Sequence, residues 1–229
     1  RYAAWAVVRE TAREMRVSDF VPLEFELSFG KDGKLPEIKV SEPDSELRVN
    51  GKVDRVDGWL HNDRLYLRVV DYKTGKKSFN LSEVRMGLDL QMLLYLFTLQ
   101  KEGARYFGHQ IEPAGVLYLP ARDDLLSAER SITPERLAAL REKNLRRSGL
   151  LLNDREVLTA MEHSALTEPH FLPLKINRDG DITDGIASAA QLGKLSICVE
   201  HLLRKIACEV RDGNIDADPC CRSEDDSVC

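Results

Sequence analysis

The sequence predicts an α/β fold, in which helices pack against a β-sheet. Three patterns indicate this class. Residues 21–29 alternate apolar and polar side chains, which is typical of a half-buried strand. Residues 111–119 are apolar almost throughout, which is typical of a central strand covered on both faces. Residues 188–210 carry apolar side chains at helical spacing, which predicts an amphipathic helix that packs on such a sheet.

The remaining elements follow from local patterns in chain order. Thr133 and Pro134 are typical of a helix N-cap and first helical position, and Gly213 is typical of a helix end. A turn at Gly58 or at Asn62-Asp63 would pair the two middle strands into a hairpin. We expect a helix over 2–15, a loop over 31–45, strands over 48–53 and 66–73, helices over 82–100, 134–147 and 150–161, and a hairpin over 171–183.

A chain of 229 residues is long enough to bury a substantial core. We expect one domain over residues 1–229, with a core at about 20–120, a helical and hairpin part at about 130–215 and an irregular tail at 216–229. The chain begins at an arginine rather than a methionine and therefore reads as part of a longer protein.

The formal net charge of −5 argues against a free-standing, non-specific nucleic-acid binder, which would be basic. It leaves a nuclease open, since metal ions supply positive charge locally. No apolar run reaches the roughly 18 residues of a membrane span, and no secretory signal pattern opens the chain. We therefore expect a cytoplasmic protein with no membrane partner. The five cysteines all lie at position 198 or later, and their odd number argues against a disulfide framework.

The strongest candidate site lies between Gly51 and Tyr95. Because side chains alternate along a strand, Asp71 and Lys73 should point to the same side of strand 66–73. Asp54 ends the preceding strand, so a hairpin would bring it close to both. Two carboxylates can begin a Mg²⁺ site, and a neighbouring lysine can orient water and stabilise charge on a phosphate. Any one of these residues alone would be read as a turn former or a solvated charge, and only the combination favours catalysis.

Gln91 and Tyr95 are polar residues in an otherwise apolar predicted helix. They are four residues apart and therefore share a face. Burying a glutamine without a hydrogen-bond partner is costly, so we expect this face to meet a polar site.

Other polar residues allow both a functional and a structural reading. Glu24 and Glu26 are either a solvated strand face or candidate metal-site residues, with Glu26 preferred as a third ligand. Lys76, Lys77 and Arg85 are candidate phosphate contacts, although surface lysines are common. We interpret two further groups as structural: Asp57 and Asp63 as turn residues, and Arg141, Lys143, Arg146 and Arg147 as a solvated helix face.

The segments GKVDRVD, VVDYKTGKKSF and LDLQMLLYL resemble the PD-(D/E)XK nuclease superfamily, in its RecB-like branch with a Q-x-x-x-Y motif. Within that branch they are most similar to the C-terminal nuclease domain of AddB-type proteins, which are subunits of AddAB-type ATP-dependent helicase–nucleases. The resemblance implies a restriction-endonuclease-like mixed sheet flanked by helices. It also implies a Mg²⁺- or Mn²⁺-dependent DNA exonuclease that processes double-strand ends for recombinational repair together with an AddA-type partner.

The resemblance also assigns roles to residues of this chain. Asp54 and Asp71 would be metal ligands, Lys73 would assist the attacking water, and Gln91 and Tyr95 would lie beside the site. From the site itself, the backbone carbonyl of Tyr72 is a further candidate metal ligand. An upstream histidine or acidic ligand is implied too, but no histidine precedes Asp54.

A 4Fe–4S cluster is implied in the full-length protein, with late cysteines spaced C-x2-C-x5-C. Here Cys220 and Cys221 are adjacent, and Cys229 fits only as the first of the three, so we expect no cluster in this chain alone. Two alternatives remain: a catalytically silent nuclease fold that binds DNA or a partner protein, and a structural iron–sulfur domain.

Overall fold

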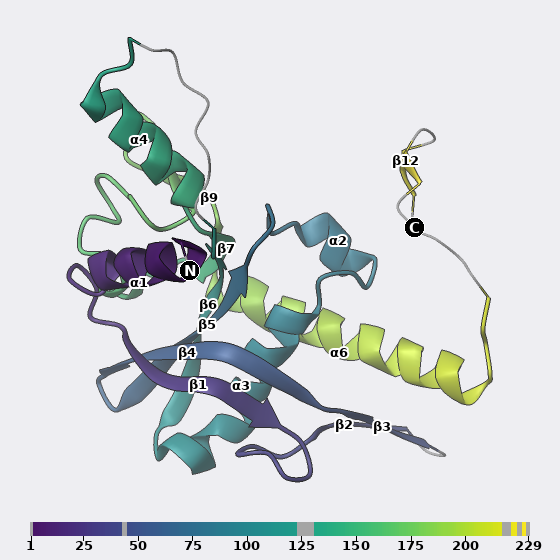
Figure 1. The fold of residues 1–229 in the computed structure, drawn as a ribbon. Coiled ribbons are helices and arrows are strands. Elements are labelled where there is room, and N and C mark those ends of the chain that lie inside the picture. The colour runs from purple at the N-terminus through teal and green to yellow at the C-terminus, as the bar shows by residue number, and fades with distance from the viewer. Residues whose placement is uncertain (1, 43–44, 123–130, 217–220, 224–225, 228–229) are drawn as a thin grey trace.

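A mixed six-stranded β-sheet runs through the computed structural model (Figure 1), which describes residues 2–42, 45–122, 131–216, 221–223 and 226–227. The β5–β6 and β7–β10 pairs are parallel, and the other three pairs are antiparallel. In spatial order the strands are β1 (Val21–Phe29), β4 (Gly51–His61), β5 (Arg64–Lys73), β6 (Gln110–Pro120), β7 (Ser148–Leu152) and β10 (Ile186–Ala187).

Helices cover both faces of the sheet, with α3 and α6 on one side and α1 on the other (Figure 1). On the first face, Leu67 and Val69 of β5 join a core with α3 and α6. On the second, Val70 and Leu117 join a core with α5. The helices are α1 (Tyr2–Glu14), α2 (Leu81–Arg85), α3 (Gln91–Phe107), α4 (Pro134–Leu145), α5 (Arg155–Met161) and α6 (Ala189–Arg211).

In the described part of the chain, three two-stranded antiparallel sheets lie outside the main sheet. The first packs against α6, and the second contains the Asp-Gly turn that the sequence predicts. They are formed by β2 (Ile38–Glu42) and β3 (Ser45–Val49), by β8 (Lys175–Ile176) and β9 (Ile182–Asp184), and by β11 (Cys221–Ser223) and β12 (Asp226–Ser227).

Most predicted elements are confirmed, and so is the fold class. Both β1 and α1 match their predicted ranges closely, and β6 is buried along most of its length, as a central strand should be. The Thr133 side chain caps α4 by accepting a hydrogen bond from the Arg136 N–H, and Gly213 follows α6 with a left-handed φ of +69°.

Four predicted segments are wrong. The strand predicted over 48–53 is the end of β3 and the start of β4, which are separate strands. Part of the predicted loop 31–45 is strand, because β2 pairs with β3. The helix predicted over 82–100 is two helices, interrupted at Asp89, whose φ is +54°. The helix predicted over 150–161 is strand β7 followed by α5, since Asp154 caps α5 by accepting hydrogen bonds from the N–H groups of Glu156 and Val157.

Two finer predictions also need correction. The buried stripe predicted for residues 188–210 includes Ile206 and Val210, but both are exposed, and Leu203 and Ala207 are buried in their place. The tail predicted to be irregular contains the short β11–β12 pair. Among the described helices, none combines the length and apolar character needed to cross a bilayer.

Candidate active site

Asp54 and Asp71 meet on the β4–β5 hairpin. The turn is Asn62-Asp63, with φ of +49° and +62°, the left-handed pair that suits a two-residue hairpin loop. Gly58, the alternative turn, lies inside β4. Asp54 likewise lies inside β4 rather than at a strand end. The hairpin register pairs Arg55 with Val70, which sets Asp54 opposite Asp71 on the same face.

The β5 strand presents Asp71 and Lys73 as an ion pair, with 2.7 Å between the lysine Nζ and the aspartate Oδ2. The Lys73 ammonium also lies 5.5 Å from the centroid of the Tyr118 ring on β6, a cation–π contact. Burial raises the pKa of Tyr118 far above its usual value, and the charges of Asp89 and Asp71 raise it further. Tyr118 therefore stays protonated and supports Lys73 without acting as a base.

The electrostatics of the two aspartates fit a divalent cation. Burial raises the pKa of the Asp71 carboxyl, Lys73 opposes that rise, and the charge of Asp54 adds to it. Two carboxylates and one ammonium carry a formal charge of −1. A cation relieves the repulsion between the carboxylates, and Mg²⁺ and Mn²⁺ prefer such oxygen ligands.

The candidate metal ligands are few. Among the described residues, no three histidine, cysteine or acidic side chains are grouped closely enough to hold a metal ion. A site at Asp54 and Asp71 would therefore draw further oxygens from backbone carbonyls such as that of Tyr72, from water and from substrate, which Mg²⁺ accepts.

Gln91 and Tyr95 lie at the start of α3, where it approaches β4. Tyr95 is buried, stacks on Phe29 with 5.5 Å between ring centroids, and accepts hydrogen bonds from the Lys52 N–H at 3.2 Å and Gln91 Nε2 at 3.1 Å. Gly51 makes room for it, because a Cβ there would lie 2.5 Å from the Tyr95 hydroxyl. Gln91 is exposed rather than buried, since it is the first residue of its helix. The premise that Gln91 is buried is therefore wrong, while its place beside a polar site stays a prediction.

The remaining predicted site residues are spread around this centre. Glu26 has a 63% exposed side chain and pairs with Lys52 at 2.6 Å, while Glu24 pairs with Lys34 at 2.6 Å. Lys77 pairs with Asp89 at 2.5 Å, a contact that no local pattern in the sequence indicates. Lys76 and Lys77 line one pocket together with Lys73, whereas Arg85 is exposed on α2 and is absent from the described lining of that pocket.

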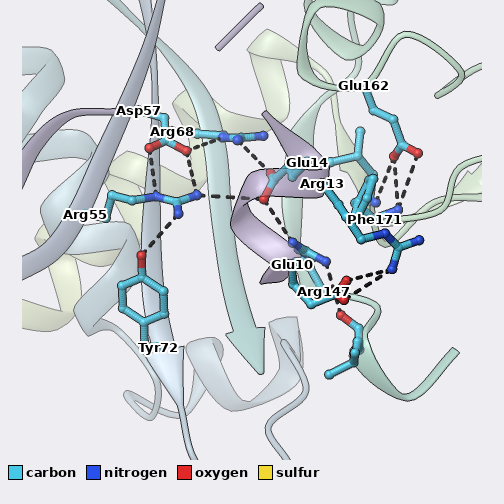
Figure 2. Close-up of polar contacts among 12 residues, drawn as sticks. Glu10, Arg13, Glu14, Arg55, Asp57, Arg68, Tyr72, Arg147, Glu162 and Phe171 are labelled. Carbon is cyan, nitrogen blue, oxygen red and sulfur yellow. Dashed lines mark hydrogen bonds and ion pairs between the residues drawn. The ribbon is translucent and has the colours of Figure 1, made fainter. Parts of the chain in front are cut away.

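A buried charge network backs the hairpin (Figure 2). Glu14 of α1 binds Arg68 at 2.7 Å and Arg147 at 3.0 Å, and all three side chains are about 2% exposed. Asp57 bridges Arg55 and Arg68 at 2.8 and 2.9 Å. Asp57 is therefore no turn residue and Arg147 no solvated one. The sequence around Asp57 and Arg147 is rich in polar residues and gives no indication that these side chains are buried.

The network reaches β5 through Tyr72. Arg55 Nη1 donates a hydrogen bond to the Tyr72 hydroxyl at 3.1 Å (Figure 2). Tyr72 stands between Asp71 and Lys73, so its side chain lies on the network side while its neighbours face the candidate site. At the far end, Arg147 lies over the Phe171 ring, and Glu162 accepts hydrogen bonds from the N–H groups of the 170–172 segment. The Glu14–Arg68 pair joins α1 to β5, and Asp57 ties β4 to the same arginine.

The iron–sulfur prediction concerns Cys229, which lies outside the described residues. Of the cysteines whose side chains are described, Cys198 and Cys208 lie on α6 and form no disulfide with each other.

Comparison with known proteins identifies the family of the chain. Residues 1–223 match the PD-(D/E)XK nuclease superfamily. The chain is also similar to proteins named as a subunit of an ATP-dependent helicase/deoxyribonuclease. It is 33% identical to that of Acetivibrio thermocellus over 95% of the chain, 34% to that of Moorella thermoacetica over 96%, and 34% to that of Clostridium botulinum (strain Hall) over 92%.

The chain spans 19% of the length of each of these relatives. Its six-stranded mixed sheet flanked by helices is the restriction-endonuclease-like fold. The chain belongs to the PD-(D/E)XK nuclease superfamily.

Proposed function

We propose that this chain is a Mg²⁺- or Mn²⁺-dependent DNA exonuclease domain that hydrolyses phosphodiester bonds at Asp54, Asp71 and Lys73. The observation that carries the proposal is the Asp71–Lys73 ion pair at 2.7 Å with Asp54 opposite on the same hairpin face. It combines the ligands of a hard cation with an ammonium group in one place.

Each residue would have a distinct role. Asp54 and Asp71, with the Tyr72 carbonyl, would hold the metal, and Glu26 remains a candidate further ligand. A bound divalent cation would act as a Lewis acid toward the phosphate oxygens. Lys73 would orient the attacking water and stabilise negative charge on the phosphate, helped by a position fixed between Asp71 and the Tyr118 ring. Gln91 and Tyr95 would hold the α3 end of the site against β4.

The larger setting is also part of the proposal. The relatives are named as subunits of an ATP-dependent helicase/deoxyribonuclease. By that likeness, the protein would act on DNA with an AddA-type partner in the cytoplasm, processing double-strand ends for recombinational repair. The full-length protein would carry a 4Fe–4S cluster that Cys229 helps to bind.

The test replaces Asp71 by asparagine and Lys73 by glutamine in the intact protein. Cleavage of linear DNA with Mg²⁺ should fall by at least about 100-fold in each variant, while the unfolding midpoint stays near that of the wild type. An Asp71→Asn variant that cleaves at the wild-type rate would contradict the assignment.

Metal binding separates this proposal from the catalytically silent scaffold. A crystal soaked with Mn²⁺ should show an anomalous peak that contacts Asp54 and Asp71, and Asp71→Asn should remove the peak. A well-ordered site that takes up no Mn²⁺ would favour the scaffold.

A further inference from the structure

A basic pocket adjoins the candidate active site. It has a volume of about 210 Å³ and is lined by five cationic side chains: Lys73, Lys76, Lys77, Arg122 and Arg146. The described residues that complete its lining are neutral. Such a concentration of positive charge is unexpected in a chain of net charge −5, and it favours an anionic ligand.

The pocket is assembled from segments far apart in the sequence. Lys73 ends β5, Lys76 and Lys77 follow it in the next loop, Arg122 follows β6, and Arg146 lies between α4 and β7. The sequence predicts Arg146 on a solvated helix face. The structure instead places it just beyond the last residue of α4, where it lines the pocket. Folding therefore brings Arg122 and Arg146 to the lysines of residues 73–77.

Hydrogen bonds fix the pocket walls. Arg122 Nη1 donates to the Gly75 carbonyl at 2.7 Å, which ties down one end of the loop. At the other end, the Phe79 N–H donates to the Ser148 hydroxyl at 2.7 Å. Ser148 thus accepts from the loop and keeps its own hydroxyl proton for another acceptor in the pocket that it lines. The walls are therefore organised before a ligand binds.

Two of the cations are available to a ligand. Lys77 already pairs with Asp89, and Lys73 pairs with Asp71. Lys76 and Arg146 pair with no carboxylate in the described part of the chain, although Arg146 donates to the Pro169 carbonyl. An arginine and a lysine at one recess match the oxygens of a phosphate group.

We propose that this pocket binds a phosphate group of the DNA strand next to the bond that is cleaved. The proposal rests on the proposed nuclease function. Lys73 connects the two places, since it lines the pocket and pairs with Asp71 at 2.7 Å. The phosphate is either an internal phosphodiester or the phosphate at a strand end. Lys76 and Arg146 hold it, and the scissile bond is thereby placed over Asp54, Asp71 and Lys73.

The test measures binding of a single-stranded oligonucleotide to the intact protein in EDTA, where no cleavage occurs. Lys76→Ala and Arg146→Ala should each weaken binding by about tenfold. Each should also make the negative slope of log association constant against log salt shallower by about 0.7. The matched control is Lys205→Ala, which removes the same charge from the exposed face of α6 and should leave both quantities unchanged. Lys76→Ala carries the test if Arg146→Ala folds poorly, because Lys76 makes no described structural contact.

A second arm locates the phosphate. In a series of oligonucleotides, each with one neutral methylphosphonate, the wild type should bind one member weakly, the one modified near the cleaved bond. Lys76→Ala already lacks the phosphate contact, so the same modification should cause it little further loss of affinity. If removal of the 5′- or 3′-terminal phosphate reproduces this behaviour instead, the bound group is the terminal one. Unchanged affinity and salt slope in both variants would overturn the pocket proposal.

The two proposals fail separately. An Asp71→Asn variant that still cleaves DNA would refute the catalytic assignment without affecting the EDTA binding result. Conversely, an inactive Asp71→Asn variant combined with wild-type binding by Lys76→Ala and Arg146→Ala would refute the pocket alone.

Discussion

The carboxylate of Asp54 on β4 accepts a hydrogen bond from the backbone N–H of Tyr72 on β5, with 2.9 Å between Oδ2 and N. The backbone pairing of the two strands ends at Arg55 and Val70, and the Asp54 side chain joins the strands beyond that point. Because Tyr72 lies between Asp71 and Lys73, the same bond aligns all three candidate catalytic groups. Asp54 thus has a structural role as well as its proposed metal-binding role.

Two substitutions of Asp54 should separate these roles. Asp54→Asn keeps an oxygen that can accept from the Tyr72 N–H but removes the charge, so we expect cleavage to fall by at least about 100-fold with little change in stability. Asp54→Ala removes the acceptor too, and should also lower the free energy of unfolding by about 1–2 kcal/mol. Cleavage assays and urea unfolding measure the two effects. Equal stability of the two variants would argue against the structural role.

The close approach of Gly51 to Tyr95 predicts a second effect. In Gly51→Ala the new Cβ would meet the Tyr95 hydroxyl at 2.5 Å, so the ring must shift. We expect a loss of about 1–3 kcal/mol in the free energy of unfolding, together with slower DNA cleavage.

Gly193→Ala is the matched control. Gly193 lies within α6, and a Cβ there would meet nothing within 4 Å among the described atoms, so this variant should gain about 0.5–1 kcal/mol. Urea unfolding of both variants provides the comparison, and a Gly51→Ala protein as stable as the wild type would show that Tyr95 relaxes freely.

The buried network predicts a large stability effect at Glu14. Glu14→Gln would leave Arg68 and Arg147 without their carboxylate partner in a site that water hardly reaches, at a cost of about 3–5 kcal/mol in unfolding free energy. Glu142→Gln is the control, because Glu142 pairs with Arg13 at the surface and should cost less than about 1 kcal/mol. Chemical unfolding would contradict the prediction if the two variants lost similar amounts.

The same residue predicts acid sensitivity. Burial alone would raise the pKa of Glu14, but Arg68, Arg147 and Arg55 outweigh it and lower the pKa from 4.5 to about 2. Folding therefore favours the charged form, and its contribution, on the order of 3 kcal/mol, is complete above pH 4.5 and is lost as the pH falls through about 2.

Urea midpoints measured between pH 5 and pH 2 should show this loss. The wild type should lose stability steeply over that range, and Glu14→Gln should lose it less steeply because it lacks the titrating group. Parallel pH profiles for the two proteins would place the acid sensitivity elsewhere.

Most of the sheet can be predicted because its strands carry their own patterns. Alternation marks β1, and a continuous apolar run marks β6. The run at 150–152 is mistaken for helix because a few apolar residues fit either period, and only pairing with Gly115 and Val116 of β6 makes it a strand. The predicted helix 82–100 is interrupted between α2 and α3, where Gly87 and Asp89 have left-handed φ of +84° and +54°.

Some features of the candidate site can likewise be predicted from the sequence, and others cannot. Asp71 and Lys73 share a face because they are two residues apart in a strand, which is a local property that sequence analysis can predict. The burial of Glu14 beside Arg147, 133 residues away, and the meeting of Lys76 with Arg146 in one pocket depend on how distant segments pack. Charged side chains carry no local pattern that distinguishes a buried ion pair or a phosphate pocket from a solvated surface, because their partners come from elsewhere in the chain. These contacts could be found only from the folded arrangement of the chain.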